Sequence, residues 1–244
     1  MRPNVRDDMN CDILIRSYYK DFRWLRYCLR SIDKYCSGFR YVVVVVPESS
    51  IERLFWMGLT SSMIFRCRDY QDDYLGQQVT KLMADTFTDA DFICHVDSDC
   101  IFHRPITPRD LFSNGRLEMA MTPYRKLSRH VPWQNITQRL FRRNIAYEFM
   151  RRQPQAFPRW LYRELRDHVQ TIHGSDIESY VTAQPPRGFS EYNALGAFAY
   201  YFHRTEFTWF DTSKRKPKEE LCKWYWSWGG ISPKIQREIG IILD

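Results

Sequence analysis

DFICHVDSD, residues 91–99, is an apolar run closed by an acidic triplet. The run from Phe92 to Val96 shows no alternation of apolar and polar residues, which is typical of a strand covered on both faces in a parallel sheet. Asp97-Ser98-Asp99 follows at its carboxyl end. Because ligands in open α/β sheets bind beyond the carboxyl ends of strands, these carboxylates are expected where chemistry takes place.

The residues before this segment have a repeating strand and helix pattern. Residues 41–46 are almost pure valine, a β-branched residue that favours strands. The opening of the chain is therefore a β-α-β unit, for which a right-handed crossover is expected. In order, the sequence predicts a strand over 11–17, a helix over 21–36, a strand over 41–46, a helix over 50–60, a strand over 63–66 and a helix over 76–87.

The second half of the chain has a different pattern. Its amphipathic stretches and aromatic runs predict helices over 133–153 and 157–171, a helix start at 189–192, and strands over 198–202 and 207–210. Three tryptophans, Trp224, Trp226 and Trp228, alternate near the end. Length and a hydrophobic share of 44% allow one large α/β domain, in which we distinguish residues 10–103, residues 104–230 and a tail over 231–244.

Composition gives a first indication of compartment and partners. No stretch reaches the roughly 18 apolar residues of a membrane span, and residues 1–10 lack the apolar core of a secretion signal. The seven cysteines include no C-x-x-C pair, so a cytoplasmic protein with free thiols is expected. A net charge of +7 suggests an anionic partner, which could be a nucleotide, nucleic acid or an anionic membrane.

The acidic triplet suits a hard divalent cation. Mg²⁺ and Mn²⁺ prefer oxygen ligands and often combine one or two carboxylates with phosphate oxygens of the substrate. A polar turn is the alternative, because Asp and Ser are common in turns and Asp-x-Asp also occurs by chance.

Several motifs in order resemble the GT-A glycosyltransferases. These are the turn at residues 13–21, the segment Gly76-Gln77-Gln78-Val79-Thr80-Lys81-Leu82, the strand with its Asp-x-Asp, Phe189-Ser190-Glu191-Tyr192, and Trp226-Ser227-Trp228-Gly229-Gly230. Together they are similar to a branch found in bacteria and large algal viruses, which decorates surface glycans. The resemblance implies a mixed, mostly parallel sheet flanked by helices, with a nucleotide-sugar-binding half over 10–103 and an acceptor-binding half over 104–230.

The resemblance also implies roles for the donor half. Arg16, Ser17 and Tyr18 would hold the nucleobase and ribose. Asp97 and Ser98 would lie towards the ribose, with Asp97 and Asp99 binding Mn²⁺ or Mg²⁺. Gln78 and Lys81 would face the nucleotide from their helix, although Lys81 reads equally well as a solvated helix lysine. The donor expected is a UDP-sugar.

The acceptor half receives three further expectations from the resemblance. Glu191 would be the general base on the acceptor hydroxyl; its alternative is a first-turn glutamate favoured by the helix dipole. His203 would be a further metal ligand, whereas His95 inside the strand reads as a core histidine. Trp228 and Gly229 would form an acceptor wall or a lid over the nucleotide. The alternative is that the tryptophans are buried in the core.

Two other classes of protein remain as alternatives. A sugar-nucleotide nucleotidyltransferase also uses paired carboxylates, but its glycine-rich basic loop is missing from the turn Arg16-Ser17-Tyr18-Tyr19-Lys20. A non-catalytic nucleic-acid-binding protein would explain the basic charge, yet no RNA- or DNA-binding signature appears. The sequence therefore favours a glycosyltransferase acting on a glycan or glycoprotein acceptor, without nucleic acid and without a transmembrane segment.

Overall fold

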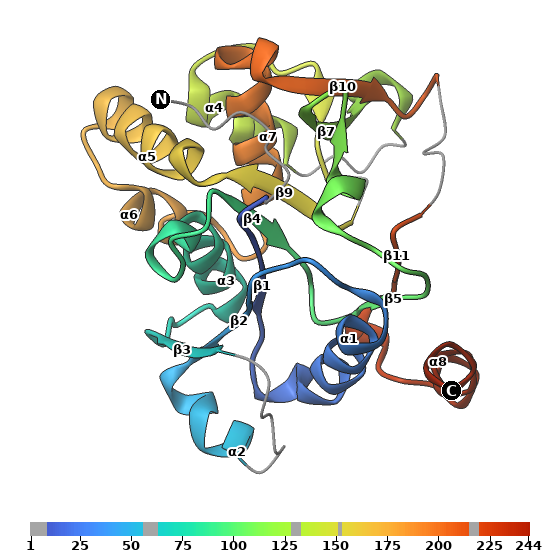
Figure 1. Cartoon of the computed structure of the whole chain (residues 1–244). Helices are drawn as coiled ribbons and strands as arrows, with labels where there is room; N and C mark the ends of the chain where they lie inside the picture. The colour runs from blue at the N-terminus through green and yellow to red at the C-terminus, as the bar shows by residue number, and fades with distance from the viewer. Residues whose placement is uncertain (1–8, 56–62, 128–132, 151–152, 215–219) are drawn as a thin grey trace.

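The computed structural model describes residues 9–55, 63–127, 133–150, 153–214 and 220–244. A five-stranded sheet with the order β3-β2-β1-β4-β9 lies at its centre (Figure 1). The first four strands are parallel, and β9 runs antiparallel to β4. The strands are β1 (Cys11–Arg16), β2 (Val42–Pro47), β3 (Met63–Cys67), β4 (Phe92–His95) and β9 (Gln155–Pro158).

Helices cover both faces of this sheet, as its unbroken apolar strands require. All six residues of β1 are buried. Figure 1 shows α1 (Phe22–Tyr35) on one side of β1 and α3 (Asp73–Leu82) with α5 (Arg159–His173) on the other. The strands predicted for the first half and the helix at 21–36 are thus confirmed, and the helix predicted over 76–87 corresponds to α3, which begins three residues earlier and ends at Leu82. It starts there because the Asp72 carboxylate caps it, accepting from the amides of Tyr74 and Leu75.

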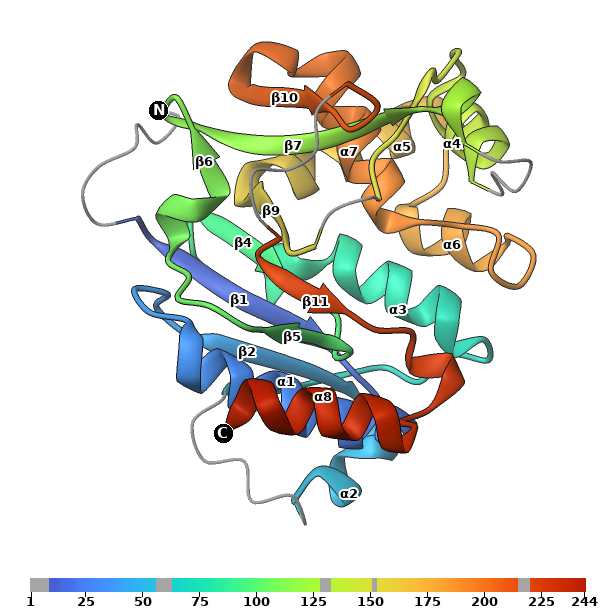
Figure 2. The same cartoon turned by 90° about the vertical axis from the view of Figure 1, so that its right-hand side faces the viewer.

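Smaller sheets extend the central one. Strand β7 pairs in parallel with β10 and antiparallel with β6 and β8, while β11 pairs antiparallel with β5, beside α8 in Figure 2. Their bounds are β5 (Cys100–Phe102), β6 (Phe112–Ser113), β7 (Arg116–Pro123), β8 (Tyr147–Glu148), β10 (Phe207–Asp211) and β11 (Cys222–Trp224). Because β9 comes from the second half of the sequence but completes the central sheet, the chain forms one α/β domain.

The remaining helices complete the described part of the chain, in which no helix is long and apolar enough to cross a membrane. The α-helices are α2 (Ile51–Phe55), α4 (Gln134–Phe141), α6 (Ile177–Thr182), α7 (Glu191–Phe202) and α8 (Pro233–Leu243). The 3₁₀ turns are η1 (Tyr19–Asp21), η2 (Glu48–Ser50), η3 (Ala84–Thr86), η4 (Pro108–Leu111), η5 (Tyr124–Lys126), η6 (Arg204–Glu206) and η7 (Ser227–Gly229). Part of the helix predicted over 50–60 lies outside the described residues.

Two predictions for the second half were wrong. The helix over 133–153 ends at Phe141, where Arg142 adopts a left-handed conformation, and the chain then enters β8. The strand over 198–202 is the end of α7. Ten consecutive residues of α7, from Glu191 to Tyr200, are buried, so its apolar run has no helical periodicity to distinguish it from a buried strand.

Candidate functional site

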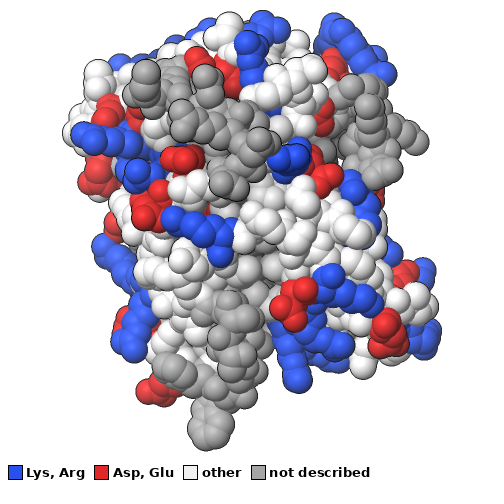
Figure 3. Space-filling model, viewed as in Figure 1, with Lys and Arg blue, Asp and Glu red and all other residues white. Residues whose placement is uncertain are grey.

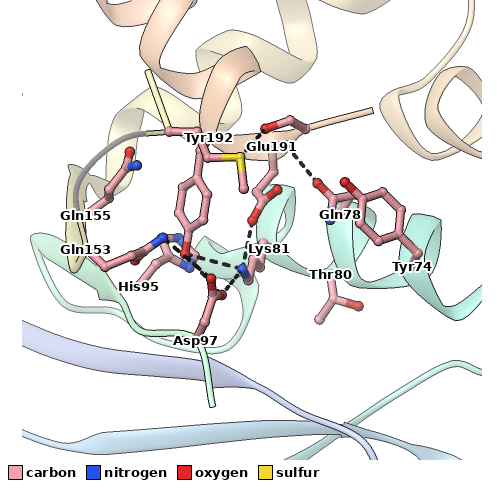
Figure 4. Close-up of polar contacts among 12 residues, drawn as sticks. Tyr74, Gln78, Thr80, Lys81, His95, Asp97, Gln153, Gln155, Glu191 and Tyr192 are labelled. Atoms are coloured by element: carbon pink, nitrogen blue, oxygen red, sulfur yellow. Dashed lines mark hydrogen bonds and ion pairs between the residues drawn. The ribbon is translucent and has the colours of Figure 1, made fainter. Parts of the chain in front are cut away.

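Lys81 lies at the centre of a buried polar group where three segments of the chain meet (Figure 4). Its ammonium Nζ is 2.5 Å from Asp97 Oδ1, 2.7 Å from Glu191 Oε1 and 3.2 Å from the Tyr192 hydroxyl. Lys81 comes from α3, Asp97 follows β4, and Glu191 and Tyr192 begin α7. We call these four residues the Lys81 cluster. Only 1% of Lys81 is exposed, which excludes the reading of a solvated helix lysine.

The start of α7 fixes Glu191 in this cluster. Ser190 is the N-cap, and its hydroxyl accepts a hydrogen bond from the amide of Asn193. The Glu191 amide donates to Gln78 Oε1 on α3 at 2.9 Å. Gln78 and Lys81 therefore both contact the first residue of α7. Gln78 accepts from the backbone amide of Glu191, and Lys81 donates to its carboxylate. Glu191 also lies in the first turn, where the helix dipole favours a carboxylate.

Charges in the Lys81 cluster depend on one another. Burial lowers the pKa of Lys81, but Asp97 and Glu191 outweigh it and hold that pKa well above its usual range. Burial raises the pKa of Glu191, and Lys81 opposes this. The ammonium of Lys81 therefore stays charged between two carboxyl groups. With both carboxyl groups ionised, the buried cluster has one more negative charge than positive charge.

Asp97 has partners on both carboxylate oxygens. The Tyr192 hydroxyl donates to Oδ1 at 3.3 Å, and the Gln153 amide donates to Oδ2 at 3.4 Å. Gln153 is itself buried. Asp97 is consequently held in one orientation by side chains from α3, α7 and the segment before β9.

Asp99, the other carboxylate of the triplet, lies in a different setting. Its Oδ2 accepts a hydrogen bond from the Ser227 amide at 2.9 Å, and its carbonyl accepts from the Tyr225 amide at 3.0 Å. Burial and, after it, the charge of Asp97 raise the pKa of Asp99 to about 7. We call Asp99 and residues 225–229 the Asp99 turn. Ser98, between the two carboxylates, is also buried.

The exposed part of this turn is aromatic. Trp228 is 58% exposed, and the Arg187 guanidinium lies 3.7 Å from its ring centroid. A Cβ on Gly229 would meet no atom within 4 Å, so the space at Gly229 is open. The competing expectation, that Trp228 is buried in the core, is wrong. An accessible aromatic plane lies one residue from the amide that holds Asp99.

The turn after β1 carries the other predicted donor-site residues. Arg16 is 2% exposed and forms a two-pronged ion pair with Asp73, with Nη1 at 2.9 Å from Oδ2. Ser17 is buried, and its amide continues the sheet by donating to the Val45 carbonyl. Tyr18 is half-buried. Arg16 thus lies at the expected edge of the sheet, with its charge already matched by Asp73.

A further acidic residue extends this edge. Asp21 lies in η1, and its pKa is raised to about 6, first by burial and then by Asp73, with a smaller contribution from Asp97. Arg16 opposes these effects. Carboxylates from η1, the start of α3 and the segment after β4 therefore influence one another near the carboxyl ends of the parallel strands, where a bound cation would relieve their repulsion.

His203 does not join this site. It is the C-cap of α7, and twelve helical residues, about 18 Å of helix, separate it from the Glu191 end. Its Nε2 lies 3.1 Å from Glu164 Oε2, and its ring packs on Trp160. The expected metal role is wrong because residues 198–202 are helical, which carries His203 away from the triplet. His95, as expected, is a core residue, 2.6 Å from the Tyr162 hydroxyl.

Several site residues were not identified from the sequence. Tyr192 and Asp21 had a usable signal, since they adjoin Glu191 and the first turn. Gln153 and Arg187 had none, because their positions depend on the path of the chain into β9 and on the loop before α7. Within the described part of the chain, no group of three or more His, Cys, Asp or Glu side chains is arranged to hold a metal ion.

Comparison with protein families gives one match, which covers residues 16–225. The chain belongs to the DUF6492 family. This is a family of unknown function, and the match extends from Arg16 to Tyr225, so it includes the Lys81 cluster and Asp99. A comparison with curated proteins found no match.

Proposed function

We propose that the chain is a metal-dependent glycosyltransferase that moves a sugar from a nucleoside-diphosphate sugar, a UDP-sugar, to a glycan or glycoprotein acceptor. One observation carries the proposal. Asp97 and Asp99 lie at the carboxyl end of β4, where α/β sheets bind ligands, and the exposed Trp228 directly follows Ser227, whose amide holds Asp99. Paired carboxylates suit a cation and a diphosphate, and an aromatic plane suits the apolar face of a sugar ring.

The residues fit a cation that is completed by the ligand. Asp97 and Asp99 provide carboxylate oxygens, and the pKa of Asp99 and of Asp21 is raised first by burial and then by neighbouring carboxylates at this edge. Mn²⁺ or Mg²⁺ commonly uses one or two carboxylates together with substrate phosphates and water. The metal would neutralise the charge that develops on the departing diphosphate. Asp99 is the better ligand, because Lys81 and Tyr192 already engage Asp97.

Glu191 has two candidate roles in this reaction. Burial raises its pKa, which suits a general base that takes a proton from the acceptor hydroxyl. Its Oε1, however, accepts from Lys81, and only 3% of the residue is exposed. In this geometry Glu191 also positions Lys81 against Asp97. We propose that Glu191 is the general base and that the Lys81 contact keeps it ionised.

The turn after β1 favours a diphosphate-sugar donor over a triphosphate. Arg16 is committed to Asp73, and the turn has no glycine with which to cradle a triphosphate. This supports a glycosyltransferase over a nucleotidyltransferase. On the face in Figure 3, basic and acidic side chains are interspersed, a pattern that gives no support to a continuous nucleic-acid track.

The test is an incubation with a panel of nucleotide sugars and Mn²⁺, with release of nucleoside diphosphate as the readout. We expect release with at least one donor, at least 100-fold slower release from Asp99→Asn, and normal release from Asp33→Asn, an exposed carboxylate on α1. Glu191→Gln should keep nucleotide binding and lose transfer. If no donor is turned over and the protein binds oligonucleotides in a salt-sensitive manner, the proposal is wrong.

A further inference from the structure

A shallow hollow with a polar lining, widely open to solvent, lies on α4, apart from the candidate site. It has a volume of about 730 Å³. The lining residues are Asn135, Gln138, Arg139, Arg142, Arg143 and Asn144. Among the lining residues that the structure describes, every one is an arginine or carries an amide, and none is acidic. Arg143 lies 4.4 Å above the ring of Tyr201, near the end of α7 that is opposite to Glu191, so the hollow is separate from the Lys81 cluster.

The ordinary explanation for basic residues here is the helix dipole. Cations are favoured at a helix C-terminus, and α4 ends at Phe141. The partial charge at such an end is roughly −0.5, which balances about half of one guanidinium. Three guanidinium groups gather here, and none of them forms an ion pair with a carboxylate of the described residues. Most of this positive charge has no anionic partner within the described chain.

Arg142 also breaks a local rule. It is the C-cap of α4 with φ 47° and ψ 40°, the left-handed region that glycine or asparagine normally occupies. A side chain in this conformation is strained relative to glycine, because its Cβ approaches the backbone too closely. An arginine at such a position adds strain and like-charge repulsion, and local conflicts of this kind concentrate at functional sites.

We propose that the α4 hollow binds a phosphate-bearing ligand. Guanidinium groups present paired N–H donors that match phosphate oxygens, and several of them suit a doubly charged anion. The rings of Tyr201 and Phe202, 4.4 and 5.4 Å from the Arg143 guanidinium, hold that group in place. The Asn and Gln amides add neutral donors and acceptors for the rest of the ligand. This site does not depend on the glycosyltransferase proposal.

Calorimetric titration with pyrophosphate in the presence of a chelator of divalent cations tests the site. Arg139→Ala combined with Arg142→Ala should weaken pyrophosphate binding at least 10-fold. The salt dependence of pyrophosphate binding should not become steeper in this double variant. The matched control is Arg26→Ala with Arg30→Ala, which removes the same charge from exposed positions on α1 and should leave binding within twofold. Equal weakening in both double variants would show a general charge effect and overturn the proposal, as would no binding by the unaltered protein.

Two further arms identify the source of the phosphate and separate binding from folding. Glucose 1-phosphate tests a sugar ester, and vesicles of phosphatidylcholine with 20% phosphatidic acid test a lipid headgroup, each compared with pyrophosphate. Arg142→Gly should raise Tm by about 2 °C, because glycine relieves the strain, and still weaken pyrophosphate binding. Unchanged binding in this folded variant would overturn the role of Arg142. UDP binding with Mn²⁺ should be unaffected in Arg142→Gly. A loss of pyrophosphate binding in this variant can therefore be distinguished from a failure of the proposed function.

Discussion

The two carboxylates of the triplet, one residue apart on each side of Ser98, belong to regions with opposite character. In the Lys81 cluster, side chains from three segments surround Asp97 and a buried ammonium offsets its charge. In the Asp99 turn, one backbone amide holds the carboxylate, no cation of the described residues pairs with it, and an exposed tryptophan follows. The first region joins the halves of the molecule, and the second is open to a ligand.

This difference separates stability from binding within one motif. A buried ion pair is strongly destabilised when one partner is removed, because the other charge remains buried. A buried carboxylate without a counter-ion is itself unfavourable, and its loss relieves the folded state. Substitutions in the two regions should therefore change the free energy of unfolding in opposite directions.

The largest effect is expected from Lys81→Met. The substitution leaves Asp97 and Glu191 buried near each other without a cation, at a cost of about 3–5 kcal/mol. Urea unfolding followed by circular dichroism should show a lower midpoint with an unchanged slope. Lys126→Met, at an exposed position, is the control and should stay within about 0.5 kcal/mol.

A second variant shows whether charge is the cause. Glu191→Gln added to Lys81→Met removes one of the two unmatched carboxylates, so it should recover part of the lost stability. If the double variant is as unstable as the sum of the single ones, lost packing explains the effect and the charge argument is wrong.

Asp99→Asn should act in the opposite direction. Burial and Asp97 raise the pKa of Asp99 from 3.8 to about 7, so the folded state binds this proton more tightly than the unfolded chain. Stability from this group is present below pH 4 and is lost as pH rises to 7. In chelator at pH 8 we expect the variant to gain ~2 kcal/mol, about half of what three pKa units represent, because the amide keeps only part of the hydrogen bonding.

The pH dependence and a neighbouring variant check this sign. The advantage of Asp99→Asn should narrow as pH falls from 7 to 4 in thermal unfolding. Asp97→Asn should destabilise at pH 8, since Lys81 loses one of its partners. A loss of stability in both variants at pH 8 would mean that the two regions do not differ as described.

A smaller effect is expected from Tyr192→Phe. The variant loses a hydroxyl that lies 3.2 Å from Lys81 Nζ and 3.3 Å from Asp97 Oδ1, while the ring stays 4.5 Å from the ammonium. One such hydrogen-bonding group contributes about 1 kcal/mol. Urea unfolding measures the loss, and Tyr27→Phe on α1, which is half-buried, should show no change. If Tyr192→Phe leaves the free energy of unfolding unchanged, only the ion pairs of the Lys81 cluster contribute to stability.

The halves of the chain differed in how far the sequence could predict them. In the first half, apolar periodicity and valine-rich strands record burial on both faces of a parallel sheet, so β1, β2, β3 and β4 were all located. In the second half, α7 is buried almost all round, and α4 stops at a left-handed arginine that no ordinary C-cap signal announces. Local pattern fails where tertiary contacts decide the conformation.

The same reason limited prediction of the site. Asp97, Asp99 and Glu191 were singled out because they follow a strand and begin a helix, which are local features. That Lys81 bridges Asp97 and Glu191 across 16 and 110 residues of sequence is a property of the assembled fold. His203 was misplaced because residues 198–202 were interpreted as a separate strand, whereas they continue α7 and so place His203 at the end of that helix opposite to Glu191.

The smallest change in stability is expected from Trp228→Ala. Trp228 is 58% exposed and contacts the Arg187 guanidinium, so its loss should alter the free energy of unfolding by less than about 0.5 kcal/mol. Loss of an aromatic plane beside Asp99 should nevertheless weaken nucleotide-sugar binding about tenfold, or 1.4 kcal/mol. Trp226→Ala is the matched control, because Trp226 is 68% exposed and stacks on Trp224 instead. Equal weakening by both variants in titrations with UDP-glucose and Mn²⁺ would mean that the Asp99 turn presents no specific sugar platform.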